Sequence, residues 1–159
     1  MNSDDRAGIM FPIFISLSGK RVLIAGGGKV AERRVRLLLD FGAEITVVAP
    51  EISPGLKEID GRIRWIKEEY TRIEGDYTLV IAATNDRDVN RRIGFDAKTM
   101  EIPVSIADMR EESSFWFPAI VREGDLVAGI ISKDGYHRSA KSAAEKVREV
   151  LKNHLEEGR

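Results

Sequence analysis

The chain has 159 residues, of which 43% are hydrophobic and 32% charged, a composition typical of a globular domain with its own core. The formal net charge of −1 argues against a protein that binds nucleic acid through bulk positive charge. There is no cysteine, which excludes disulfides, thiolate metal sites and cysteine nucleophiles. No apolar run approaches the ~20 residues of a membrane span, and the first residues lack the basic start of a signal peptide, so we expect a cytoplasmic protein.

Apolar runs and helical patterns alternate along the first part of the chain. In chain order they predict a strand at 21–25, a helix at 30–41, strands at 44–49 and 62–67 with a short helix from 54 to about 59 between them, a strand at 78–83, a helix ending near 99 and a strand at 103–107. We expect Gly42 to end the first helix, Ser53 to cap the second, and Asn85 or Asp86 to cap the third. Such alternation predicts right-handed crossovers and an α/β fold with a Rossmann-type parallel sheet.

The pattern changes after Asp108. Two apolar runs, at 115–121 and 126–131, are joined by four mostly polar residues and predict a β-hairpin. This hairpin is too apolar to stand in water, so we expect a homodimer in which residues 115–131 pack against a second copy of the chain. A last helix is expected at 139–155, with Ala140, Ala143, Ala144, Val147, Val150 and Leu151 on its inner side. The predicted domains are therefore 1–112, which binds a nucleotide, and 113–159, the dimerisation hairpin plus C-terminal helix.

The most informative segment is residues 20–31, KRVLIAGGGKVA. A β-rich apolar run leads directly into G-x-G-x-x-A, and an apolar-periodic helix follows, which is the context that a dinucleotide-binding fingerprint requires. Gly26 permits a tight turn, Gly28 lets the backbone approach a pyrophosphate, and Ala31 lets the helix pack close to the strand. Because free N–H groups at the helix start would face the phosphates, the turn at 26–30, including Gly27, predicts a bound dinucleotide.

Further candidates follow the other strands, since ligands gather beyond the carboxyl ends of an open parallel sheet. The small Ala82 and Ala83 would let a cofactor lie against the backbone, and Thr84 and Asn85 could donate hydrogen bonds to its ribose or phosphates. Asp86 is better explained as a helix cap.

Glu51 is the candidate for the ribose-binding acid, which is expected about 20 residues past the glycines, near the end of the second strand. The match is imperfect because the strand ends in Ala49 and Pro50, with Glu51 just beyond. No arginine occupies this turn to bind a 2′-phosphate, which favours NAD over NADP. The alternative is an exposed loop glutamate without a ligand.

Asp108 ends the last parallel strand, where a carboxylate can reach the reacting end of a cofactor; the alternative is a turn-forming role ahead of Met109. His137 and His154 are the two histidines, and with no cysteine they form no recognisable metal site. We interpret His154 as a surface residue. His137 lies in a loop that could contact a substrate or simply face solvent.

Four segments together give the chain a specific resemblance. They are PIFISLSGKRVLIAGGGKVAERRVRLLLDFGAEITVVAP, LVIAATNDRDVNRRI, IPVSIAD and SSFWFPAIVREGDLVAGII, and they span roughly residues 12–131. In order and spacing they resemble the precorrin-2 dehydrogenases, the NAD-dependent module of siroheme synthase. The glycine motif alone is generic, whereas its combination with the AATND element and the hairpin motif is much more specific.

The resemblance implies NAD-dependent oxidation of precorrin-2 to sirohydrochlorin, with ferrous iron insertion in some family members. It implies that Asp108 is the catalytic aspartate. It also implies that Lys29 and Val30, at the glycine turn, and Pro50 and Glu51, after the second strand, contact NAD. The hairpin would belong to a dimerisation region in which two chains intertwine.

The chain departs from the family pattern at three places. Ser105 stands where the family usually has asparagine, residues 134–140 replace a G-G-x-S-P turn, and the family's additional C-terminal helical region is largely missing. These departures leave tetrapyrrole binding and iron insertion open. The alternative function is a non-catalytic module that binds NAD or a tetrapyrrole as a sensor or carrier; a short oxidoreductase with another small substrate is a third.

Overall fold

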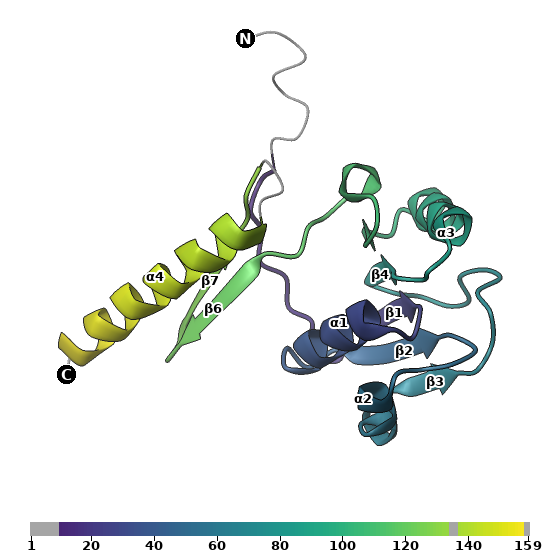
Figure 1. Cartoon of the computed structure of the whole chain (residues 1–159), viewed down its shortest axis with the longest axis horizontal. Coiled ribbons are helices and arrows are strands. Elements are labelled where there is room, and N and C mark those ends of the chain that lie inside the picture. The colour runs from purple at the N-terminus through teal and green to yellow at the C-terminus, as the bar shows by residue number, and fades with distance from the viewer. Residues whose placement is uncertain (1–9, 134–136, 158–159) are drawn as a thin grey trace, which may run out of the picture. The chain divides into compact units, whose positions relative to one another are not determined.

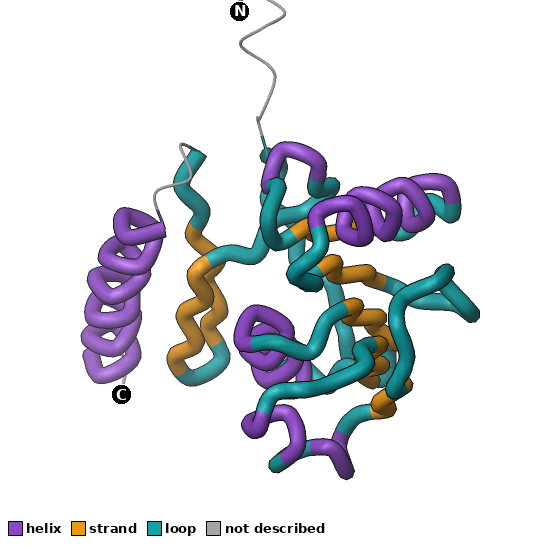
Figure 2. Tube along the Cα trace, turned by 45° about the vertical axis from the view of Figure 1, so that its right-hand side comes forward, coloured by secondary structure: helices purple, strands orange, loops and turns teal. Residues whose placement is uncertain are grey.

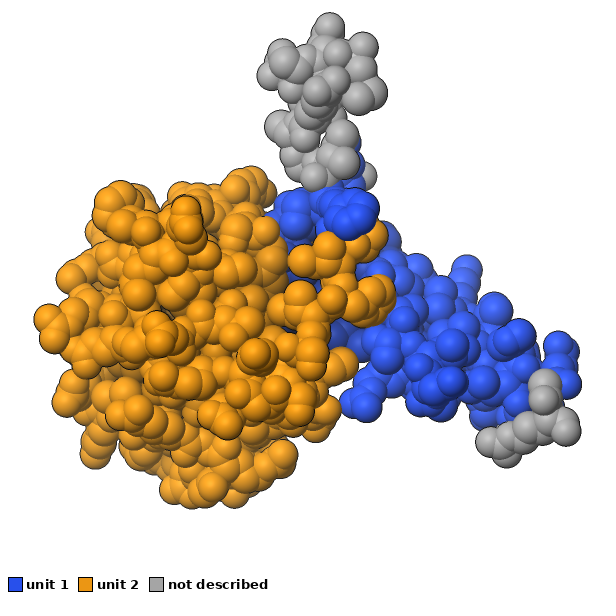
Figure 3. Space-filling model, turned by 180° about the vertical axis from the view of Figure 1, so that it is seen from behind, with its two compact units in different colours: residues 1–11, 116–159 blue, residues 12–115 orange. Residues whose placement is uncertain are grey.

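The computed structural model describes residues 10–133 and 137–157. The N-terminal residues 1–9, residues 134–136 of the altered turn, and the side chain of His137 lie outside the described part. The chain forms two compact units, unit 2 with residues 12–115 and unit 1 with residues 1–11 and 116–159, which Figure 3 colours separately. The domain limits expected from the sequence, 1–112 and 113–159, stay a prediction.

Unit 2 is built on a five-stranded parallel sheet. Its strands are β1 (Arg21–Ala25), β2 (Glu44–Val48), β3 (Arg64–Ile66), β4 (Leu79–Ala82) and β5 (Val104–Ile106). They lie in the order β3-β2-β1-β4-β5, and all four neighbouring pairs are parallel. Figure 2 shows these strands in orange with helical segments packed along them. The predicted α/β fold with a Rossmann-type sheet is confirmed, and β3 lies at one edge of the sheet.

Helices cover both faces of this sheet. Helix α1 (Lys29–Leu39) connects β1 to β2, and α3 (Arg87–Thr99) connects β4 to β5. The chain moves from β1 toward one sheet edge and from β4 toward the other, so right-handed crossovers place the two helices on opposite faces (Figure 1). As a result β1 is buried on both sides, which explains its continuous apolar sequence.

Helix α2 (Pro54–Lys57) follows β2 and is shorter than the sequence predicts. Its cap is the expected one, because Ser53 Oγ accepts a hydrogen bond from the Leu56 N–H at 3.2 Å. Residues 58 and 59, expected to end this helix, form a turn instead, and the 3-10 helix η2 (Asp60–Arg62) follows.

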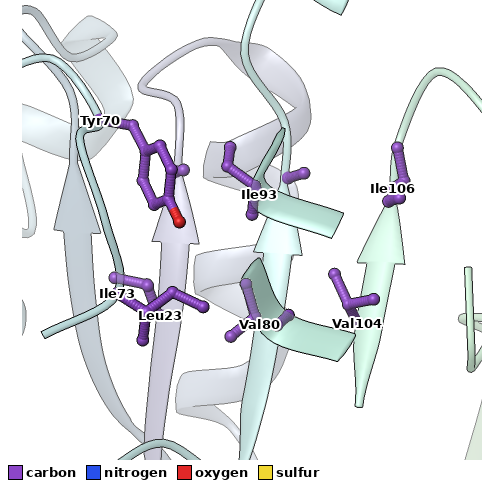
Figure 4. Close-up of a cluster of buried hydrophobic side chains, with 10 residues drawn as sticks. Leu23, Tyr70, Ile73, Val80, Ile93, Val104 and Ile106 are labelled. Atoms are coloured by element: carbon purple, nitrogen blue, oxygen red, sulfur yellow. The ribbon is translucent and has the colours of Figure 1, made fainter. Parts of the chain in front are cut away.

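The core on the α3 face joins three strands to that helix. Figure 4 shows Leu23 of β1, Val80 of β4 and Val104 of β5 packed with Ile93 of α3 and Tyr70 of the β3–β4 connection. All five are at most 9% exposed. This packing fixes where α3 begins relative to the carboxyl ends of β4 and β5.

Two serines close the free edge of β5. The Val104 N–H donates to Ser114 Oγ at 2.7 Å, and the Ile106 N–H donates to Ser113 Oγ at 2.8 Å. The Ser114 N–H in turn donates to the Val104 carbonyl at 2.8 Å. The segment after β5, including the 3-10 helix η3 (Arg110–Glu112), thus folds back along the strand and satisfies the edge that a sixth strand would cover.

Unit 1 contains a hairpin and a long helix. Strands β6 (Ala119–Glu123) and β7 (Leu126–Ile130) pair antiparallel, and α4 (His137–Glu157) lies alongside them in both Figure 1 and Figure 2. The predicted hairpin is confirmed, but its first strand was predicted too early. Pro118, which has no N–H to donate, precedes the strand, and pairing of Glu123 with Leu126 leaves a two-residue turn.

The predicted inner side of α4 is correct at Ala140 and Ala144, which are buried against the rest of unit 1. Ala143, Val147 and Leu151 are half-buried, as predicted, and Leu155 continues this stripe. The prediction is wrong at Val150, which is 65% exposed and lies off the stripe. Among the described residues, no helix is long and apolar enough to span a membrane.

Candidate functional site

The chain reverses its direction of travel across the sheet between β1 and β4, and this switch point opens a cleft at the carboxyl ends of the strands. The β1–α1 turn begins at Gly26, whose N–H donates to the Val48 carbonyl at 2.9 Å. On the other side, the Ala83 N–H donates to the Ala25 carbonyl at 2.8 Å. These two hydrogen bonds hold the carboxyl ends of β1, β2 and β4 together next to the turn.

Two of the three glycines are required by close backbone contacts within the protein. Gly26 has φ +116°, and a Cβ there would lie 2.1 Å from the Ala83 carbonyl oxygen. A Cβ on Gly27 would lie 2.0 Å from the Glu51 carbonyl oxygen, so the turn also packs against the loop after β2. The role of Gly27 in this close approach was not apparent from the sequence motif.

Gly28 differs from its neighbours. It is the N-cap residue of α1, its φ of −84° suits any residue, and a Cβ there would meet no atom within 4 Å. Nothing inside the described protein requires a glycine here. The absence of a side chain instead leaves the N–H groups of the first helical turn open, with no side-chain cap, for an anion to approach. The glycine turn therefore fits a dinucleotide pyrophosphate.

The cleft has a volume of about 870 Å³, within the size range of small-molecule and cofactor sites. Its lining comes mainly from the β1–α1 turn, the loop after β2, the β3–β4 connection and the loop after β4. The lining residues are Gly26, Gly27, Gly28, Lys29, Val48, Ala49, Pro50, Glu51, Ile52, Ser53, Glu69, Tyr70, Ala83, Thr84, Asn85, Asp86 and Val89. Of the residues predicted from the sequence to bind NAD, all line this cleft except Val30.

Val30 is the second residue of α1 and is 40% exposed, but it is absent from the cleft lining. Its backbone N–H still belongs to the open first turn of the helix. The predicted contact through Val30 therefore stays a prediction and would rest on its main chain.

The cleft lining contains more negatively charged than positively charged side chains. Among the residues that line it, Lys29 carries a positive charge, while Glu51, Glu69 and Asp86 are carboxylates. Glu51 and Lys29 are both exposed, so their side chains can turn toward a ligand. A cleft with one cation at the pyrophosphate turn and carboxylates elsewhere suits ribose hydroxyls better than an additional phosphate.

A polar network holds the loop after β2 against α1. Ser53 Oγ donates to Glu32 Oε2 at 2.7 Å, Arg36 Nε donates to Glu32 Oε1 at 3.2 Å, and the Ser53 N–H donates to the Gly27 carbonyl at 2.7 Å. The hydrogen bond from Ser53, followed by that from Arg36, lowers the pKa of the Glu32 carboxyl below its usual value of 4.5. The network fixes the position of Glu51 relative to the glycine turn.

Thr84 is held by the helix that follows it. Its hydroxyl donates to Asn90 Oδ1 at 2.7 Å, its N–H donates to the same oxygen at 3.0 Å, and Asn90 Nδ2 donates back to the Thr84 carbonyl at 3.1 Å. Asn90 is fully buried. Because the hydroxyl proton of Thr84 is used inside the protein, Thr84 shapes the cleft floor, and Asn85, whose exposed side chain has no hydrogen bond within the described residues, is the freer donor.

Asp86 takes the role expected of a cap. Its Oδ1 accepts hydrogen bonds from the N–H groups of Asp88 at 2.8 Å and Val89 at 3.1 Å. The next residue, Arg87, begins α3.

Asp108 lies outside the cleft lining, two residues beyond β5 on the same carboxyl edge of the sheet. It is paired with a cation, since Arg87 Nη1 lies 3.6 Å from its Oδ1. The other arm of the guanidinium, Nη2, donates to Glu112 in a close ion pair. This hydrogen bond from Arg87 to Glu112 is the main cause of a raised pKa at Arg87.

Residues 13–119 match a protein-family model described as "Putative NAD(P)-binding", which covers the whole parallel sheet and the cleft. The chain belongs to this NAD(P)-binding family.

Two proteins with similar sequences are named for siroheme biosynthesis. It is 46% identical over 144 residues, or 88% of its length, to a siroheme biosynthesis protein of Ruminiclostridium josui. It is 40% identical over 148 residues to siroheme synthase 3 of Aeromonas hydrophila, covering 91% of this chain. It spans 28% and 31% of those two proteins, so it corresponds to one part of each.

A solved structure agrees with this assignment. The precorrin-2 dehydrogenase SirC superposes with a TM-score of 0.68 at 29% sequence identity, over 91% of this chain and 71% of SirC. The resemblance to the precorrin-2 dehydrogenases that the sequence motifs indicate is therefore confirmed.

Within this NAD(P)-binding family member, two functional candidates escaped the sequence interpretation. Arg87 follows a helix cap, where the sequence offers no reason to expect a partner at the end of another strand. Tyr70 lies in a connection without a motif; it lines the cleft while its hydroxyl donates to Asp96 Oδ2 at 2.7 Å. Burial, reinforced by that hydrogen bond, raises the pKa of Tyr70, so the phenol stays neutral and holds this wall of the cleft to α3.

Proposed function

We propose that the chain catalyses the NAD-dependent oxidation of precorrin-2 to sirohydrochlorin. The observation that carries the proposal is the open position at Gly28, beside the helix start, in a cleft of cofactor size at the switch point of the sheet. Similarity to SirC and to the siroheme proteins supplies the substrate.

The chain's own residues would bind the dinucleotide in three places. The N–H groups of the first turn of α1 and Lys29 face the pyrophosphate position. Glu51 accepts from ribose hydroxyls, and the loop with Thr84 and Asn85 supports the part of the cofactor that lies over β4. When bound, NAD supplies the hydride acceptor. The excess of carboxylates in the cleft supports NAD rather than NADP.

Oxidation of precorrin-2 removes a hydride and a proton, so that precorrin-2 and NAD⁺ give sirohydrochlorin, NADH and H⁺. We assign the proton to the carboxylate of Asp108, which lies on the carboxyl edge of the sheet and is 36% exposed. A positioned base of this kind contributes about 10²–10⁴-fold in rate. If Asp108 only orients the substrate, its removal would cost less.

The proposal includes a homodimer through residues 115–131 and a cytoplasmic location, where NAD is available. Exposed apolar side chains on the hairpin, such as Val127 at 44%, support the dimer. Among the described residues, no group of three or more histidine and carboxylate side chains is arranged to hold a metal ion.

The direct test is to incubate the protein with precorrin-2 and NAD and to follow the absorbance of sirohydrochlorin together with that of NADH. Equal amounts of both products are expected. Binding of NADH or of the tetrapyrrole without turnover would contradict the proposal and favour the non-catalytic sensor or carrier. A reaction without precorrin-2 is the control for unrelated reduction of NAD.

A further inference from the structure

The ion pair between Arg87 and Asp108 is not needed to hold the backbone around Asp108 in place. The backbone around Asp108 is already held, because the Ala107 N–H donates to the Ala82 carbonyl at 2.9 Å and the Glu112 N–H donates to the Met109 carbonyl at 3.2 Å. The side chain of Asp108, by contrast, is 36% exposed and would be free to rotate. Arg87 Nη1 is the cation within ion-pair distance of it among the described residues.

The two terminal nitrogens of the Arg87 guanidinium contact two different carboxylates. Glu112 holds Nη2, which fixes the plane of the group, and Nη1 then faces Asp108 Oδ1 at 3.6 Å. Nη1 is buried and makes no hydrogen bond within the described residues, so its remaining donor capacity is directed at this carboxylate. A buried donor without a partner is costly, and a small rotation of Asp108 would bring it into hydrogen-bond range.

We propose that Arg87 is a positioning residue that orients the carboxylate of Asp108 for the reaction. The inference rests on the proposed function and deepens it. Arg87 starts α3 directly after Asp86, a residue of the cofactor cleft, so the same residue connects the cleft loop to the carboxylate beyond β5. Arg87 therefore sets the distance between the proton-accepting group and the cofactor.

The experiment compares kcat and KM, with precorrin-2 and NAD, for Arg87→Gln, Arg87→Lys, Asp108→Asn and the double variant Arg87→Gln/Asp108→Asn. Arg91→Gln is the matched control, since it removes an exposed arginine of the same helix whose ion pair is with Asp88, at 3.5 Å. Misplacement of a reacting group costs up to about 100-fold, so Arg87→Gln should lower kcat by about 10- to 100-fold with an unchanged KM for NAD. Arg87→Lys, which keeps the charge but not the two arms of the guanidinium, should recover only part of the loss.

The double variant separates positioning from a structural role. If Arg87 acts through Asp108, Arg87→Gln should cause no further loss in the Asp108→Asn background. An equal loss in both backgrounds, or a loss that Arg91→Gln reproduces in full, would overturn the inference and leave the proposed function intact. Parental kcat in Arg87→Gln would do the same. Absence of turnover in the parent protein overturns the proposed function and, with it, this inference.

Discussion

Arg87 Nη1 lies 3.6 Å from Asp108 Oδ1, which joins the first residue of α3 to the loop beyond β5. In sequence they are separated by the rest of α3 and by β5, and the packing of Ile93 against Val104 and Ile106 helps to bring them together. The relationship places an ion-paired carboxylate on the carboxyl edge of the sheet, the edge at which the cleft opens.

Asp108→Asn should reduce the turnover of precorrin-2 by about 10²–10⁴-fold, because an amide cannot accept the proton. Dinucleotide affinity should change little, since Asp108 does not line the cleft. Steady-state kinetics with precorrin-2 and fluorescence titration with NADH measure the two quantities. Near-parental turnover would reduce Asp108 to a turn residue, and a large loss of NADH affinity would show that its effect is on the cleft.

The two outer glycines of the turn should respond in opposite ways. Gly28→Asp should abolish NADH binding and leave the melting temperature nearly unchanged, because a Cβ there meets nothing within 4 Å while the carboxylate faces the pyrophosphate position. Gly26→Ala should destabilise the fold by about 2–4 kcal/mol, since it combines positive φ with a 2.1 Å approach to the Ala83 oxygen. NADH titration and thermal unfolding of both variants test this pair. Unimpaired NADH binding by Gly28→Asp would mean that the cofactor site lies elsewhere.

Much of this fold could be predicted because the sequence patterns that specify it lie within short segments of the chain. The alternation of apolar strands and helices predicts the sheet, and the glycine turn predicts its switch point. The start of β6 was misplaced because the apolar run Phe115, Trp116 and Phe117 looks continuous with the strand, whereas Pro118 and the pairing register begin it later. Register depends on the partner strand, which sequence periodicity does not contain.

The candidate site was predictable where residues follow strand ends and not where they depend on tertiary contacts. Glu51, Thr84 and Asn85 follow strands and line the cleft. Arg87 and Tyr70 gain their roles from partners more than 20 residues away, Glu112 and Asp96. No local pattern carries such information.

Glu51 should decide the preference between NAD and NADP. In the parent protein NADH should bind more tightly than NADPH, and Glu51→Gln should weaken NADH by about tenfold or more, the value of hydrogen bonds to a charged group. Glu44→Gln is the control, because it removes the same charge from an exposed residue at the opposite end of β2. Equilibrium titration of both dinucleotides is the measurement. Tighter binding of NADPH by the parent would remove Glu51 from the ribose role.

Glu32 should make stability depend on pH. Its pKa is lowered in the folded state, chiefly by the hydrogen bond from Ser53, so the carboxylate stabilises the fold above 4.5 and this contribution is lost as the pH falls through the lowered value. Glu32→Gln should therefore melt at a lower temperature than the parent at pH 7, and the gap should close as the pH falls through the lowered pKa. Glu74→Gln, at an exposed ion pair with Arg72, should show little gap at any pH. A gap for Glu32→Gln that is independent of pH would contradict the assignment.

The hairpin should form a homodimer. Val127 is 44% exposed on β7 and Ile131 is 40% exposed just beyond it, which is more apolar surface than a two-stranded hairpin keeps in water. Light scattering at micromolar concentration should give twice the mass of the chain, and Val127→Asp should shift the protein to monomer, because it places a charge in the contact. Phe95→Asp is the matched control, since Phe95 is 70% exposed on α3, outside residues 115–131, and its variant should stay dimeric. A monomeric parent, or equal loss of the dimer in both variants, would exclude an interface centred on the hairpin.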